Sequence, residues 1–146
     1  MTTHIQAYNE MAQLFKDAWD TTGFAAVYND VPPDAAAIAA IDVTSGTVVP
    51  WARFATKPNF RTQRSLGGPG GRRFDSTGIV IVEIYTPTGD GLTLARSLHT
   101  LVEQAFEGVS TLNGVWFRNV RTEPAAVSGP WSHSNIIAEY QYDEVR

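Results

Sequence analysis

The stretch SLGGPGGRRFDSTGIVIVEIYTPTGDG, residues 65–91, decides the fold of this 146-residue chain. Its first part, residues 65–77, is a basic loop that holds four of the chain's 12 glycines. Glycine loses more backbone freedom on ordering than any other residue, so we expect this loop to be mobile in an isolated chain. Its second part, residues 78–86, is an almost unbroken run of β-branched and aromatic side chains. That run predicts a central strand that is covered on both faces.

The sequence on either side predicts an α+β fold with the element order α-β-β-β-α-β-β. A first helix is expected, because apolar side chains recur at helical spacing at Ile5, Tyr8, Ala12, Phe15 and Trp19. A second helix is expected over residues 91–107, capped by Asp90. Strands are expected at residues 24–28, 47–56, 78–86, 115–123 and 135–143. We predict a single domain, residues 1–146, with both helices on one face of a mainly antiparallel or mixed sheet.

Three connections are expected to be loops. The one at residues 57–77, between the second and third strands, is too long for a tight hairpin. Unstructured connections longer than ~12–15 residues are usually functional or disordered, so we expect a long mobile loop that orders on assembly. Residues 34–47, between the first two strands, and residues 124–130, before the last strand, are also interpreted as loops.

Composition excludes several classes of site. The chain has no cysteine, which excludes disulfides, thiolate zinc sites and cysteine nucleophiles. The sequence shows no apolar signal-peptide core and no apolar run of membrane-spanning length. We therefore expect a soluble protein without membrane contact that remains where it is made.

The net charge of −4 is unevenly distributed along the chain. Between Asp42 and Asp75 there is no acidic residue, and six basic residues lie there: Arg53, Lys57, Arg61, Arg64, Arg72 and Arg73. The rest of the chain has 5 basic and 15 acidic residues, a net charge of −10. Such asymmetry indicates electrostatic docking to nucleic acid or to an acidic protein surface, and a solvated loop is the plain alternative.

No catalytic, cofactor-binding or metal-binding motif is found. The glycines of residues 67–73 lack the lysine, the spacing and the strand–loop–helix context of a phosphate-binding loop. The histidines His4, His99 and His133 are dispersed along the chain. Glu83, a lone acid in an apolar strand, is interpreted as a salt-bridge partner for a loop arginine. We expect no enzyme; a pocket that gathered Glu83, Asp90 and His99 would reopen the question.

The fourth strand mixes aromatic and basic residues, as proteins that bind single-stranded nucleic acid do. Strict alternation places Phe117 and Arg121 on one face and Trp116 and Arg118 on the other. Because a stacking platform needs its aromatic and cationic side chains together, the pattern predicts a nucleic-acid site only weakly.

The pattern as a whole resembles the tail terminator proteins of long-tailed bacteriophages, the family typified by the lambda minor tail protein U. The matching motifs, in order, are WARF at 51–54, SLGG at 65–68, RR at 72–73, EIYTP at 83–87, GDG at 89–91 and YQYDE at 140–144. The resemblance covers nearly the whole chain, and its specificity lies in the order and spacing of the motifs. The departure is at residues 34–47, which have the character of an insertion.

The resemblance implies a structural virion protein without enzymatic activity or cofactor. Such proteins form a hexameric ring that caps the tail tube, stops its polymerisation and gives the head a docking surface. Expected partners are further copies of the chain, the tail tube protein and a head–tail connector, and DNA passes through the lumen. We expect an interface at Arg61, Arg64, Arg72, Arg73, Phe74 and Trp131, whereas Trp51 is expected to pack in the core. The alternatives are another head–tail joining protein or a nucleic-acid-binding module that uses the arginine loop.

Overall fold

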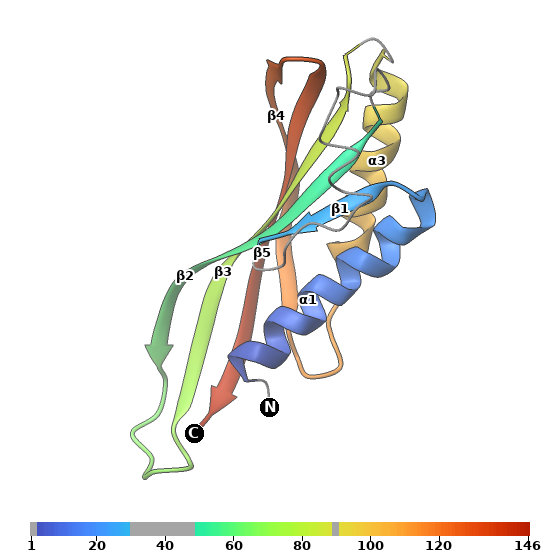
Figure 1. Cartoon of the computed structure of the whole chain (residues 1–146). Helices are drawn as coiled ribbons and strands as arrows, with labels where there is room; N and C mark the ends of the chain where they lie inside the picture. The colour runs from blue at the N-terminus through green and yellow to red at the C-terminus, as the bar shows by residue number, and fades with distance from the viewer. Residues whose placement is uncertain (1–2, 30–48, 89–90) are drawn as a thin grey trace.

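The computed structural model describes residues 3–29, 49–88 and 91–146 (Figure 1). In chain order the elements are α1 (His4–Trp19), a 3-10 turn η1 (Asp20–Thr22), β1 (Ala25–Tyr28), β2 (Trp51–Gln63), β3 (Arg73–Pro87), α3 (Gly91–Phe106), β4 (Trp116–Ser128) and β5 (Trp131–Val145). The predicted α+β class and the element order are confirmed. The expectations for residues 34–47 and for the Asp90 cap lie outside the described residues.

Helix α1 begins and ends at residues suited to those places. Thr3 caps it in a capping box, accepting a hydrogen bond from the Gln6 amide while the Gln6 side chain accepts one from the Thr3 amide. Gly23, at a φ of 73°, takes the left-handed conformation that turns the chain toward β1. The buried stripe is Ala7, Met11, Phe15 and Trp19. The prediction that Ile5 belongs to this stripe is wrong, because Ile5 is 70% exposed.

The sheet has five strands in the order β1-β2-β3-β5-β4. β1 pairs in parallel with the first residues of β2, and every other neighbouring pair of strands is antiparallel. The predicted mixed, mainly antiparallel sheet is therefore confirmed, and β3 lies in its centre between β2 and β5. This order brings the C-terminal strand against the strand that follows the glycine-rich loop.

Both helices pack on the same face of the sheet (Figure 1). Alternate residues of β3 and β5 point into this layer, including Val80, Val82, Ala138 and Tyr140. They meet the apolar stripe of α1 and that of α3, which consists of Leu98, Val102 and Phe106. The period of two in the strands and of about 3.6 in the helices thus produces one core.

The opposite face of the sheet, called here the outer face, is covered by neither described helix. Ile79 and Ile81 of β3 point to it and are half-buried. The prediction that this strand is covered on both faces is therefore not met within the described part of the chain. A continuous apolar run was expected to mark a strand between two layers, but among the described residues it marks a strand with one face packed against helices and the other packed against none.

The predicted long mobile loop at residues 57–77 is wrong. β2 continues to Gln63 and β3 already begins at Arg73, so the connection is only residues 64–72 (Figure 1). Pairing with β5 explains the difference, because Arg73 lies opposite Val145 and the early residues of β3 gain a partner on each side. Likewise the predicted loop at residues 124–130 is mostly strand, since β4 runs to Ser128 and turns into β5 at Gly129 with a φ of 60°.

Among the described residues, no helix is long and apolar enough to cross a membrane.

Candidate functional site

The candidate site is the exposed end of the β2–β3 hairpin, residues 57–73, which we call the arm. Every residue from Lys57 to Arg64 in β2 and the following turn is exposed, and the hairpin extends away from the helices (Figure 1). A bulge between Pro58 and Phe60 shifts the register at the base of the arm. Four of the six residues predicted to form an interface, Arg61, Arg64, Arg72 and Arg73, lie on it, and Phe74 follows directly.

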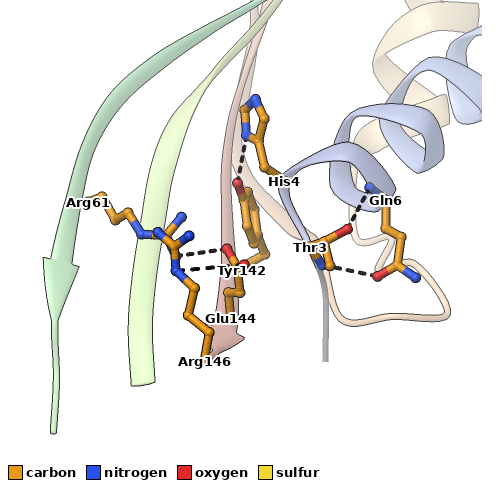
Figure 2. Close-up of polar contacts among 7 residues, drawn as sticks. All are labelled: Thr3, His4, Gln6, Arg61, Tyr142, Glu144 and Arg146. Atoms are coloured by element: carbon orange, nitrogen blue, oxygen red, sulfur yellow. Dashed lines mark hydrogen bonds and ion pairs between the residues drawn. The ribbon is translucent and has the colours of Figure 1, made fainter. Parts of the chain in front are cut away.

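On the helix side of the arm, Arg61 is held within the chain. Its Nη2 donates to Oε2 of Glu144 at 2.7 Å (Figure 2). Its guanidinium lies 4.9 Å from the centre of the Phe74 ring. Arg146 approaches the same groups, with its guanidinium 5.4 Å from the Phe74 ring and its Nε 4.0 Å from Glu144 Oε1. The Phe74 ring therefore contacts two cations that share one carboxylate.

Helix α1 is tied to the base of this cluster. His4 Nδ1 lies 3.1 Å from the hydroxyl of Tyr142, which is two residues before Glu144 in β5 (Figure 2). The start of α1 and the end of β5 are thus joined beside the arm.

On the outer face, two more arginines are paired with acids of β3 and β5. Arg64 Nε donates to Asp75 Oδ2 at 2.5 Å, and Arg73 binds Asp143. Asp75 and Asp143 face each other across the two strands. The pKa of Asp75 is lowered, because a hydrogen bond from the facing Asp143 side chain and then the guanidinium groups of Arg64 and Arg73 favour its ionised form over the opposing effect of burial.

Arg72 differs from the other three arginines. Its Nε donates to the carbonyl oxygen of Gly67 at 3.0 Å, within the loop, and it forms no ion pair with any described residue. Its main chain exchanges two hydrogen bonds with that of Arg146. Beside it the loop presents Leu66, whose side chain is 98% exposed.

Most arginines of the basic segment therefore form ion pairs with acidic residues of the same chain. The basic segment meets the acidic C-terminal strand, and Arg61, Arg64 and Arg73 are not free as was expected. Sequence reasoning missed their partners, which are Asp75, Asp143 and Glu144. The available signal was the acidic ending YQYDE, but using it required knowing that β5 lies beside β3.

Trp131, the sixth predicted interface residue, lies at the other end of the sheet. It packs edge-on against Trp51 and Tyr85, which stack at 4.1 Å, and Tyr85 stacks on His133 at 4.5 Å. Trp51 is 4% exposed, in keeping with its predicted core role. The indole nitrogens of Trp51 and Trp131 are buried without a hydrogen-bond partner in the described structure.

Of the residues considered for catalysis, Glu83 lies in β3 and His99 on α3, and Asp90 lies outside the described residues. Glu83 pairs at 3.5 Å with Arg53 in β2, which corrects the expectation of a loop arginine, and also accepts from the Tyr85 hydroxyl. His99 is half-buried on α3, and burial lowers its pKa. Within residues 3–29, 49–88 and 91–146, no group of three His, Cys, Asp or Glu side chains is placed to hold a metal ion.

Comparison with known proteins gives the fold alone. No protein-family model matches the chain, and no curated protein matches it. A solved structure that carries no functional name is similar, with a TM-score of 0.60 and 15% sequence identity over 92% of this chain and 94% of that chain. At this identity the likeness extends to the arrangement of helices and strands and to nothing finer.

Proposed function

We propose that this chain is a tail terminator of a long-tailed bacteriophage, a structural virion protein of the lambda minor tail protein U-like family. Six copies form a ring that caps the tail tube at its head-proximal end, stops its polymerisation and offers the docking surface for the head. The protein has no enzymatic role, assembles in the host cytoplasm and lets DNA pass through the ring. The order of the sequence motifs and the two-helix, five-strand fold support this proposal.

The observation that carries the proposal is the tip of the arm. Leu66 is 98% exposed and Arg72 lacks an ionic partner in the described structure, so folding of a single chain leaves both unused. A protruding apolar and cationic tip fits a contact with the next subunit. When one patch contacts a different patch on the neighbour and the rotation between subunits closes, the product is a ring.

The arginine pairs within the arm fit the same function. Exposed ion pairs are worth only ~0–1 kcal/mol each, so the pairs of Arg61, Arg64 and Arg73 fix the shape of the arm without committing it to one partner. The Phe74 ring also helps to fix the shape of the arm, because the guanidinium groups of Arg61 and Arg146 both pack near it.

The test is capping of tube ends, measured as the length distribution of tubes polymerised from purified tail tube protein in the presence of this protein. Leu66→Ser and Arg72→Glu should abolish the length limit while leaving thermal unfolding unchanged. The matched controls are Leu112→Ser, which changes a side chain equally exposed but outside the arm, and Arg96→Glu on α3. Wild-type protein that leaves tube lengths unchanged would contradict the proposal.

Another head–tail joining role would give a different result in the same assay. Such a protein would bind the head connector and ignore the tube. Binding to the head connector without binding to the tube would identify the chain as a head–tail joining protein of another kind.

A further inference from the structure

The outer face carries a row of residues that spans four strands at the base of the arm. Phe60 of β2 lies opposite Thr77 of β3, Thr77 lies opposite Gln141 of β5, and Gln141 lies opposite Trp116 of β4. We call these four residues the aromatic row. One aromatic ring stands at each edge of a polar floor, on a face that neither described helix covers.

Both rings of the aromatic row are exposed. Phe60 is 61% exposed and Trp116 is 40% exposed, whereas Trp19 and Trp51 are only 1% and 4% exposed. Three strand spacings of ~4.8 Å put their Cα atoms about 14 Å apart. A ligand that reaches both rings is therefore an extended molecule and not a single small ring.

Cations flank the aromatic row at both edges. Lys57 is exposed on β2, and the guanidinium of Arg118 lies 5.5 Å from the Trp116 ring on β4. Neither Lys57 nor Arg118 forms an ion pair with a described residue. A hollow of about 120 Å³ lies beside Arg118, lined by residues that include Phe60, Thr77 and Glu139.

A bulge in β4 gathers these groups, contrary to the predicted alternation. Asn119 has a φ of 52°, and the register shifts between Arg118 and Arg121. As a result Arg121, expected on the face of Phe117, lies opposite Ile137 on the same face as Trp116 and Arg118. The sequence objection to a stacking platform, that its aromatic and basic side chains are divided between two faces, therefore does not hold in the structure.

The acid beside Arg118 already has partners of its own, as Asp75 and Asp143 on the same face do. Glu139 lies opposite Arg118, but its Oε2 accepts a hydrogen bond from the Asn119 side chain at 2.8 Å and lies 3.5 Å from Arg121. Arg121 is therefore already in an ion pair. Lys57 and Arg118 form none with a described residue, so their charges are available to bind a ligand.

We infer that this face binds single-stranded nucleic acid, with bases stacked on Phe60 and Trp116 and backbone phosphates against Lys57 and Arg118. Exposed aromatic rings with flanking cations on an open sheet are the means by which proteins bind single strands without sequence preference. Bases in a duplex are stacked on one another and cannot reach the rings, so the site selects single strands. The site is separate from the arm tip, and the inference does not depend on the ring.

The test is fluorescence anisotropy of a labelled oligothymidylate of about 12 nucleotides, a length within the range of single-strand binding sites. Phe60→Ala and Trp116→Ala should each raise Kd about fivefold or more, and Trp116→Phe should retain binding. Changing both Lys57 and Arg118 to Ala should make the slope of log K against log salt shallower by about 1.4, which is 0.7 for each lost phosphate contact. Leu112→Ala and Arg96→Ala are the matched controls and should change nothing.

Three results would overturn the inference. They are the absence of oligonucleotide binding at low salt, binding that Phe60→Ala and Trp116→Ala both leave unchanged, and self-association that the double variant Phe60→Ala/Trp116→Ala abolishes while oligonucleotide binding is absent. The last result would assign the face to a second copy of the chain. Capping of tail tubes is measured separately, so the ring and this site can fail independently.

Discussion

At the scale of single residues, Gly78 explains how β2, β3 and β5 fit together. A Cβ at this position would lie 2.4 Å from the Tyr140 hydroxyl and 2.5 Å from the Lys57 carbonyl oxygen. Tyr140 therefore lies where the side chain of residue 78 would otherwise be, and its burial there raises the pKa of its hydroxyl to about 12. The sequence places Gly78 at the start of the predicted strand 78–86 but gives no reason for a glycine there. The reason for its presence appears only when β5 is placed beside β3.

Gly78→Ala should lower the free energy of unfolding by about 1–3 kcal/mol, because overpacking of this size forces neighbouring groups to move. Urea unfolding measures the change. Gly71→Ala is the matched control, since its new Cβ would meet only the Gly68 carbonyl oxygen at 3.7 Å, an ordinary contact. Equal stability losses in the two variants would contradict the packing explanation.

Asp75 gives a residue-scale prediction in pH. Its pKa is lower in the folded chain than the ~3.9 of an unfolded aspartate, so the folded state favours the ionised form. The stability it contributes is present above the unfolded pKa and is lost as the pH falls through the lower folded pKa. Between about pH 5 and pH 3 the wild type should therefore lose more unfolding free energy than Asp75→Asn. Equal losses of unfolding free energy in the two proteins would show that Asp75 does not cause the acid destabilisation.

At the scale of elements, the sequence predicted which helices and strands exist better than where the strands end. The helix at residues 91–107 matches α3 within one residue, because its apolar stripe is periodic and local. β2, β3 and β4 all run beyond their predicted ends, through residues that glycine, proline and charge had marked as loop. Those residues are strand because a neighbouring strand completes their hydrogen bonds, and that neighbour is distant in sequence.

The loop of the arm should be dispensable for folding. Its contacts within the chain are few, such as the hydrogen bonds from the Gly71 amide to the Gly68 carbonyl and from Arg72 to Gly67. Deletion of residues 67–71 should leave the thermal unfolding transition of the monomer in place and weaken assembly, as measured by sedimentation. Loss of the cooperative transition on deletion would show that the loop belongs to the folding unit.

At the scale of the whole molecule, the two described helices form a layer on one face of the sheet. The predicted interface is divided between two ends of that sheet, with five of its residues on or beside the arm and Trp131 at the far end. Sequence reasoning identified the basic segment but treated its arginines as free, since it could not foresee that Asp143 and Glu144 would lie against them. In the described part of the chain, a smaller set of groups lacks partners: the exposed Leu66 side chain, the Arg72 charge, and parts of the outer face such as Phe60 and Trp116.

The most direct test of the account is the mass of the protein in solution, measured by sedimentation across protein and salt concentration, with and without tail tube protein. The account predicts a species of about 96 kDa, six times the 16.0 kDa chain, either alone or on tube ends. Arg72→Glu should lower the population of this species, and Arg96→Glu should leave it unchanged. A 16.0 kDa monomer at every concentration that also ignores the tube would contradict the ring.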